Sequence, residues 1–436
     1  MVCNHGDPTQ NPLRSRGLLS KVVPTHPDPP EATPLSLKNR LRASGLPRTT
    51  WVLTAAGLLV AIGFGVVIPV LTPFARTFGA TTFQLGLVVS LFAAMRLITS
   101  PFASRFGRRV GERNAITIGM LIVAASTVVI AVAPSLWLVM LARALGGIGS
   151  ATFTISALNL LLATAPEKLR GRATGLYQGG FLLGNMTGPA LGGLLGAVSL
   201  QAPFWFYAAM LLVASTFTMT MLPARATLPQ QVHKREPRRF SVVLRDIRYQ
   251  AACMVALGQG WQSFGVRNAI IPLFVTEALL LDTAWTGIAF AIAAVAQTAM
   301  LVPAGNATDR IGRRPVMIAS GVICGVATIA MPFSSSIWIL VVVLSIYGAG
   351  AAMQGTAPTA AVGDATQGRG GLPVAAFSMV TDLGSIFGPL VAGAVIDAWS
   401  FQAAFAIGGV ILLAGSVYAY FIPKDLDREF LVAPAS

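Results

Sequence analysis

The chain has few charged residues and very few histidines and cysteines. Only 11% of its 436 residues are charged, whereas about a quarter are charged in an average soluble protein. The three cysteines match no metal-ligand spacing, and the three histidines lie outside the long apolar segments. The sequence contains no nucleotide-binding loop and no catalytic triad. These absences predict a protein that is not an enzyme, binds no metal or other cofactor, and is not an ATP-driven pump by itself.

Hydrophobic residues are abundant and make up 54% of the chain. A helix needs about 20 apolar residues to cross a membrane. Twelve segments are long enough, and they lie at about residues 51–74, 84–104, 114–133, 136–163, 172–197, 203–222, 249–276, 284–307, 316–333, 337–363, 372–398 and 401–422. The sequence therefore predicts an all-α membrane protein with twelve transmembrane helices. Residues 1–20 have no apolar core, so we expect no cleavable signal peptide.

The net charge of +15 could indicate a nucleic-acid-binding protein, but the positions of the charges argue against it. Of the 31 lysines and arginines, 27 lie before, after or between alternate spans, and the opposite connections hold only Arg76. This asymmetry predicts a multi-pass protein of the cell membrane with both termini in the cytoplasm. The basic segments would then face the anionic headgroups of the inner leaflet, and we expect no nucleic-acid partner.

Two glycine–proline elements show that the chain is an internal repeat. The first element contains Gly184, Gly188, Pro189, Gly192 and Gly193, and the second contains Gly384, Gly388 and Pro389 at an offset of 200. Glycines four residues apart form a groove that allows a neighbouring helix to approach closely. Both halves start on the same side of the membrane, which predicts a parallel repeat. The predicted parts are a disordered cytoplasmic tail (1–50), a six-helix lobe (51–222), a cytoplasmic linker (223–248), a second six-helix lobe (249–422) and a cytoplasmic tail (423–436).

A charged loop motif is also repeated. Residues 305–314 read Gly-Asn-Ala-Thr-Asp-Arg-Ile-Gly-Arg-Arg, and residues 104–113 are the counterpart in the first half. In the counterpart, Arg108 stands where the second copy has Asp309.

With these motifs the chain resembles the major facilitator superfamily, and more narrowly its twelve-span drug:proton antiporters. Residues 305–314 resemble the superfamily's loop signature, and residues 143–149 resemble its arginine motif. Residues 184–193 resemble the antiporter motif, and Gly63 through Pro73 the proline motif of the first span. The resemblance implies alternating access, a role for Arg143 in proton movement, and a glycine groove at the contact that closes one face. Because Arg108 stands where the family has an acid, the resemblance does not extend to the charge relay of the first loop.

Ionisable residues inside spans are costly and are therefore candidates for function. Asp382 is the only carboxylate deep in a predicted span, so we assign proton coupling to Asp382, Arg96 and Arg143. Arg96 and Asp382 lie midway along spans two and eleven. In the superfamily that the chain resembles these two spans face each other, and the resemblance together with the similar depth predicts an ion pair between the two residues. The alternatives are that Asp382 only neutralises an arginine, and that Arg143 only anchors one helix to another.

Polar residues in spans seven, four and ten are candidates for the substrate cavity. Gln259, Gln262, Ser263 and Arg267 share one face of span seven if it is α-helical throughout. They could line the cavity or form a polar contact between helices. Asn159, Gln354 and Tyr347 are weaker candidates.

The second loop motif is a candidate gate. Its members are Asp309, Arg310, Gly312, Arg313 and Arg314. One acid among three bases can bridge to a neighbouring helix end, and such a bridge could break as the lobes move. The alternative is a solvated turn.

Together these features predict a monomeric secondary active transporter that exports small amphipathic or lipophilic compounds in exchange for protons. Its expected partners are a small-molecule substrate, protons and the lipid bilayer. One alternative is a transporter of a defined metabolite, such as a sugar or an amino-acid derivative. A lipid flippase or membrane enzyme is a further alternative, which the lack of catalytic carboxylate or histidine clusters disfavours.

Overall fold

The computed structural model describes residues 46–166, 169–223, 240–366 and 372–423. Most of both predicted tails and of the linker lies outside these residues. The described residues form helices and no strands, and eleven helices are long and apolar enough to cross a membrane. These are α2 (Arg48–Arg76), α3 (Thr82–Val110), α4 (Glu112–Ala131), α5 (Leu136–Thr164), α6 (Arg170–Val198), α7 (Ala202–Met221), α11 (Thr283–Arg310), α12 (Arg313–Ala330), α13 (Ile337–Thr366), α14 (Leu372–Ala398) and α15 (Phe401–Tyr420).

The seventh predicted span is helical but is not a single α-helix. It consists of α9 (Ile247–Gln259), the π-helix η2 (Gly260–Val266), α10 (Arg267–Leu273) and a second π-helix, η3 (Phe274–Ala278). In a π-helix each N–H bonds five residues back, and such segments are frequent at functional sites. Residue pattern alone gave no sign of this break. A short helix, α8 (Phe240–Leu244), also lies within the predicted linker.

Polar residues and glycines fix where several helices begin. Thr81 and Gln84 form a capping box at the start of α3, which satisfies N–H groups that have no partner within the helix. Asp282 caps α11 in a similar way. Gly111 and Gly312 occupy equivalent places in the two loop motifs, at φ of 89° and 108°. Side chains other than glycine rarely adopt these angles, so the turn into the next helix requires glycine at both positions.

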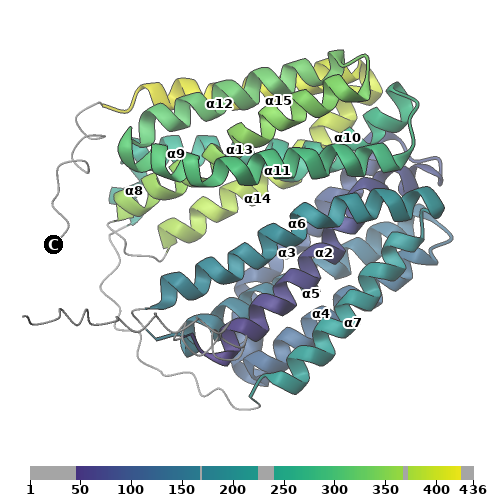
Figure 1. Ribbon diagram of the computed structural model, residues 1–436, viewed down its shortest axis with the longest axis vertical. Helices are drawn as coiled ribbons and strands as arrows, with labels where there is room; N and C mark the ends of the chain where they lie inside the picture. Colours follow the sequence, from purple (N-terminus) through teal and green to yellow (C-terminus); the bar gives the residue numbers. More distant parts are fainter. Residues whose placement is uncertain (1–45, 167–168, 224–239, 367–371, 424–436) are drawn as a thin grey trace, which may run out of the picture. The chain divides into compact units, whose positions relative to one another are not determined.

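The helices form two six-span halves, each with buried hydrophobic side chains of its own. Helices α2–α7 are coloured purple to teal and α9–α15 green to yellow in Figure 1. In the first half, Leu53, Leu85 and Phe204 belong to one buried cluster. In the second half, Tyr347 and Phe405 belong to another. The predicted twelve-helix, two-lobe fold is confirmed.

Candidate functional site

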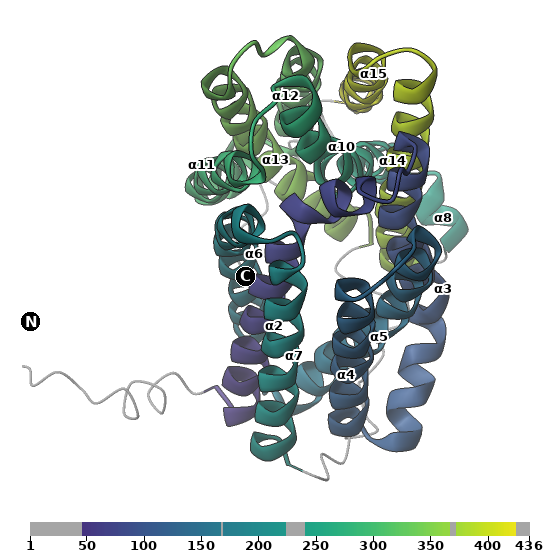
Figure 2. The same ribbon diagram turned by 90° about the vertical axis from the view of Figure 1, so that its right-hand side faces the viewer.

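The two halves meet mainly through two equivalent helix pairs, α6 with α11 and α3 with α14 (Figure 2). The contacts lie toward one end of the bundle, which we call the distal end. It carries the connections at residues 77–81, 132–135, 199–201, 279–282 and 399–400. The opposite end, which carries the linker, is called the proximal end.

The first glycine–proline element forms the contact between α6 and α11. A Cβ added at Gly193 would lie 2.9 Å from both the Ala284 carbonyl oxygen and the Gly287 Cα. A Cβ at Gly287 would overlap the carbonyl of Pro189. The two backbones therefore touch directly, which only glycine permits.

The second element makes the equivalent contact between α14 and α3. A Cβ at Gly86 would overlap the carbonyl of Pro389, and a Cβ at Gly393 would lie 2.5 Å from the carbonyl oxygen of Thr82. The Ser90 hydroxyl donates a hydrogen bond to the Ile386 carbonyl at 2.6 Å. Both repeats thus use the same part of the motif to join the halves.

The glycine stripe of the first element faces a different neighbour from the one expected. Cβ atoms at Gly184, Gly188 and Gly192 would all meet the backbone of α2, and at Gly188 the nearest atom is the Ile62 carbonyl oxygen at 2.6 Å. Because α2 belongs to the same half, the expectation that this stripe closes one face was wrong. It packs the interior of the half, while Pro189 and Gly193 on an adjacent face meet the other half. In the second element, Gly384 and Gly388 likewise pack on span seven of their own half.

Charged residues strengthen the contact at the distal end. Arg76 Nε lies 2.8 Å from Glu277 Oε1 across the two halves. Asp397, in the last turn of α14, accepts hydrogen bonds from the backbone N–H groups of Thr82 and Phe83 at 2.9 and 2.8 Å. A carboxylate is favoured at a helix N-terminus, because the first N–H groups have no partner within the helix.

The expected pair between Arg96 and Asp382 is present. Arg96 Nη2 lies 3.5 Å from Asp382 Oδ1, and the two side chains are 43% and 24% exposed. The contact joins α3 to α14 and therefore spans the two halves. Of the ion pairs between described residues that cross the halves, only this one lies midway along its helices.

Arg143 is buried and contacts α3. Its Nε donates to the Val88 carbonyl oxygen at 3.4 Å, and its guanidinium lies 4.3 Å from the centre of the Phe92 ring. It therefore joins α5 to α3, a contact that suits the anchoring alternative.

The four polar residues of span seven do not share one face. The Ser263 and Tyr347 hydroxyls are 2.7 Å apart, and Arg267 lies over the ring of Phe290 at 5.5 Å. Gln262 is fully buried and faces Gly408 of α15 instead. The expectation of one polar stripe was wrong for Gln262, because η2 changes the angular spacing between successive side chains. Gln259 lies near α13, because its Nε2 would be 3.9 Å from a Cβ placed at Gly355.

Two of the three weaker cavity candidates, Gln354 and Asn159, have different surroundings. Gln354 is buried on α13, and neither atom of its amide has a hydrogen-bond partner. Asn159 donates a hydrogen bond to Glu112 Oε1 at 3.3 Å. Glu112 is a buried carboxylate that sequence reasoning missed as a candidate, since it was treated as part of an exposed loop. The sequence offers one sign that Glu112 is unusual. It is an acid at the position where the second loop motif has the base Arg313.

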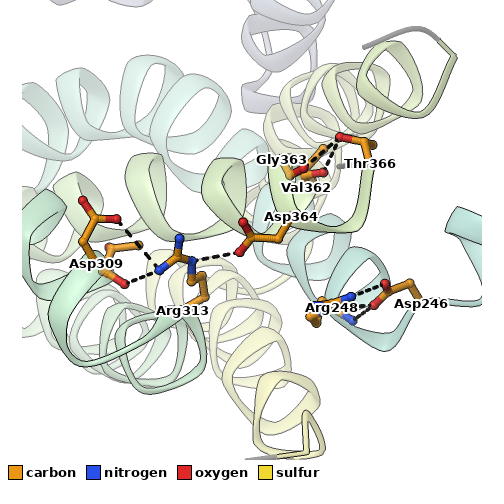
Figure 3. Close-up of polar contacts among 9 residues, drawn as sticks. Asp246, Arg248, Asp309, Arg313, Val362, Gly363, Asp364 and Thr366 are labelled. Atoms are coloured by element: carbon orange, nitrogen blue, oxygen red, sulfur yellow. Dashed lines mark hydrogen bonds and ion pairs between the residues drawn. The ribbon is translucent and has the colours of Figure 1, made fainter. Parts of the chain in front are cut away.

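The second loop motif connects four helix ends of its own half, those of α11, α12, α13 and α15, and Figure 3 shows the contacts of the first three. Arg313 Nε lies 2.9 Å from Asp364 near the end of α13, and its Nη1 lies 3.9 Å from Asp309. Arg314 donates to the Tyr420 carbonyl oxygen at 2.8 Å. Arg310 is exposed, and the side chain of Asp309 is 75% exposed. The expected bridge to a neighbouring helix end is thus present between Arg313 and Asp364.

No group of three or more His, Cys, Asp and Glu side chains within the described ranges could hold a metal ion. Cys253 and Cys324 are free thiols.

A family model of the Major Facilitator Superfamily matches residues 53–267 and 252–433. Among curated proteins, multidrug resistance protein 2 of Bacillus subtilis (strain 168) is 24% identical over 384 residues, covering 84% of this chain and 94% of that protein. The quinolone resistance protein NorA of Staphylococcus aureus (strain N315) is also 24% identical, covering 78% of this chain and 87% of its own length.

Solved structures share the fold at low sequence identity. A D-xylose–proton symporter matches with a TM-score of 0.70 at 16% identity and covers 86% of this chain and 98% of its own. A bacterial homologue of the human lysosomal transporter Spinster, in an inward-facing and occupied conformation, matches with a TM-score of 0.67 at 17% identity, covering 90% and 99%.

Proposed function

Because the chain belongs to the major facilitator superfamily, whose members are transporters, we propose that it is a secondary active exporter that moves small amphipathic or lipophilic compounds out of the cell in exchange for protons. Alternating access would come from movement of one six-span half against the other. The relatives named for multidrug and quinolone resistance support drug-like substrates.

The ion pair between Arg96 and Asp382 carries the proposal of proton coupling. Either charge alone would be unfavourable midway along a membrane helix, and the pair relieves both. Protonation of Asp382 would remove its negative charge and release Arg96. Because the two residues belong to different halves, that release would weaken the contact between α3 and α14. Proton binding would then favour movement of the halves. Arg143 would support this step by holding α5 against α3 beside the pair.

The proposed orientation identifies the conformation. With both termini in the cytoplasm, the distal end faces the exterior. The contacts between the halves lie toward that end, which makes this an inward-facing conformation. Glycines at the proximal end have open space around them, since a Cβ at Gly175, Gly179 or Gly363 would meet no atom within 4 Å.

The second loop motif would act as a gate at the proximal end. Asp309 is free to meet a partner from the other half when that end closes, because its side chain is largely exposed. Arg313 and Asp364 would hold the helix ends in place around it. The linker and the basic loops would lie against anionic lipid headgroups, and the working unit would be a monomer.

The decisive experiment uses purified protein in proteoliposomes with an imposed pH gradient. We expect wild-type protein to accumulate at least one dye of a panel of an anionic, a neutral and a cationic lipophilic dye in a gradient-dependent way. Asp382→Asn should bind the dye normally and equilibrate it without accumulation. Asp425→Asn, a change of the same type in the C-terminal tail, should behave as wild type. Unchanged gradient-driven accumulation by Asp382→Asn would refute the coupling. Uptake of a sugar or an amino-acid derivative, without transport of any dye, would favour the metabolite alternative.

A further inference from the structure

The described part of the bundle interior contains more positive than negative charge. Away from the helix ends, the spans hold three arginines, Arg96, Arg143 and Arg267, and one carboxylate, Asp382. Asp382 pairs with Arg96. The carboxylates nearer the helix ends already have partners, as with Glu277 and Arg76. Neither Arg143 nor Arg267 forms an ion pair with a carboxylate of the described residues.

Arg143 and Arg267 differ in how their charge is accommodated. Arg143 is buried against α3, where a carbonyl oxygen and the face of Phe92 surround its guanidinium. Arg267 is half-buried, and its Nε has no hydrogen-bond partner. It cannot reach water at the distal end of its span. It lies eleven positions before Ala278, a helical rise of about 16 Å, which is longer than an arginine side chain.

The groups near Arg267 are those of a site for an aromatic molecule with a polar group. Phe290 of α11 presents its ring to the guanidinium at 5.5 Å. The hydroxyls of Ser263 and Tyr347 lie together between span seven and α13. Gln354 lies two turns from Tyr347 on the same face of α13, and its buried amide has no partner on either atom. A charge without a counterion and a buried amide without a hydrogen-bond partner both favour a ligand that contacts them.

We propose that Arg267 binds an anionic group of the substrate, so that the transported compounds are aromatic amphipathic anions such as carboxylates. The inference rests on the proposed transport function and narrows its substrate class. The carboxylate pairs with the guanidinium, which can donate two parallel hydrogen bonds. The aromatic part packs beside Phe290 and Tyr347, and Gln354 donates to a second polar atom. Ligand binding thereby supplies the negative charge that the bundle lacks.

The test compares three forms of one scaffold. The probes are naphthalene-2-carboxylate, its primary amide, and the corresponding naphthylmethylammonium ion, with the same three forms of biphenyl as a second set. Equilibrium dialysis against the purified protein measures their affinities. We expect wild-type protein to bind each carboxylate at least about tenfold more tightly than the amide, as for a hydrogen bond to a charged group. Arg267→Gln should remove this preference, and Arg267→Lys should keep most of it.

Controls separate the possible failures. Arg428→Gln in the C-terminal tail should leave the preference unchanged, and size-exclusion profiles should show that each variant is folded. Equal affinity for carboxylate and amide in wild-type protein would overturn the inference, as would a preference that survives Arg267→Gln. Tighter binding of the ammonium form would also overturn it. Export driven by the pH gradient is measured separately. If the pH gradient drives export of the neutral amide and the protein shows no preference for the carboxylate, the anion site is refuted and the transport proposal stands. If the protein binds the carboxylate preferentially but the gradient drives no export, the transport proposal is refuted.

Discussion

Arg76 and Glu277 form an ion pair across the two halves, at the distal ends of spans one and seven. Their side chains meet at 2.8 Å. Spans one and seven are counterparts in the repeat, so the pair joins the same end of both halves. Opposite charges at these two ends make the contact attractive.

Reversing these charges should shift the equilibrium toward separation at the distal end. Arg76→Glu places two acids together, and Glu277→Arg places two bases together. An exposed pair contributes about 0.2–1 kcal/mol, so the ratio of closed to open distal ends should fall a few-fold. Spin labels at Val132→Cys and Phe333→Cys, which are exposed at equivalent positions of the halves, would report the change as a longer distance.

The double reversal is the matched control for the charge argument. Arg76→Glu combined with Glu277→Arg restores an attractive pair with the charges exchanged. Its distance distribution should return toward that of wild type. If the double variant opens the distal end as far as both single variants, attraction between these residues does not hold the halves together.

Two glycines of the first element should respond differently to the same substitution. Gly193 touches the other half, so Gly193→Leu should leave each half folded but prevent closure of the distal end. Gly188 touches α2 of its own half, where a Cβ would lie 2.6 Å from a carbonyl oxygen. Gly188→Leu should therefore destabilise that half, by about 1–3 kcal/mol or more for overpacking.

Thermal unfolding and spin-label distances together distinguish the two cases. Gly193→Leu should show a near-normal melting temperature and an open distal end. Gly188→Leu should show a lowered melting temperature or poor yield. If instead Gly193→Leu lowers the melting temperature and Gly188→Leu opens the distal end, then Gly188 faces the other half in the functional protein and Gly193 faces α2.

Much of the fold was predictable because it depends on patterns that a sequence displays directly. Length and apolar composition located all twelve spans, and the offset between Pro189 and Pro389 identified the repeat. The pair of Arg96 and Asp382 could also be inferred, since both charges lie at similar depth in their spans and spans two and eleven face each other in the superfamily that the chain resembles. The cost of a charge in lipid made the two residues candidates, and the resemblance supplied the neighbouring helices.

Other features depend on packing that the sequence does not display. The π-helix η2 lies where span seven passes close to α14, since a Cβ at Gly260 would overlap the carbonyl of Thr381, and η2 places Gln262 away from the other polar residues. The glycine stripe showed that some helix approaches closely, but it did not show which one. Glu112 appeared to lie in a solvated loop, although the absence of a side chain at Gly107 leaves room for its carboxylate inside the half.

Loss of the carboxylate at Asp364 should destabilise the second half. Arg313 and Asp364 are both largely buried and meet at 2.9 Å, so Asp364→Ala leaves a guanidinium without its main acceptor. We expect the free energy of unfolding to fall by about 1.5–3 kcal/mol, the range for hydrogen bonds to charged groups. Asp309→Ala is the control, because its exposed carboxylate lies 3.9 Å from Arg313 and should contribute less than about 1 kcal/mol to stability. A chemical denaturation series on both variants would compare them.

The proposed orientation predicts which engineered cysteines react from each side. Gln230→Cys in the linker should react with a membrane-impermeant thiol reagent only in inside-out vesicles. Leu280→Cys, at the highly exposed position between η3 and α11, should react only in right-side-out cells. Labelling of both from the same side would contradict the placement of the termini in the cytoplasm.

Asp397 should hold the distal end closed through the backbone of the other half. Its two carboxylate oxygens accept from the first two N–H groups of α3, groups that have no partner within the helix. Asp397→Ala removes both hydrogen bonds and the favourable charge at the helix start. Loss of a cap costs about 0.5–2 kcal/mol, so the closed distal end should become roughly two- to thirtyfold less favoured. Asp397→Asn retains one acceptor oxygen and should have an intermediate effect. The same labels at positions 132 and 333 would measure the change, and thermal unfolding would test whether the halves remain folded. If Asp397→Ala lowers the melting temperature without lengthening the distance between the labels, Asp397 stabilises its own half and does not join the two.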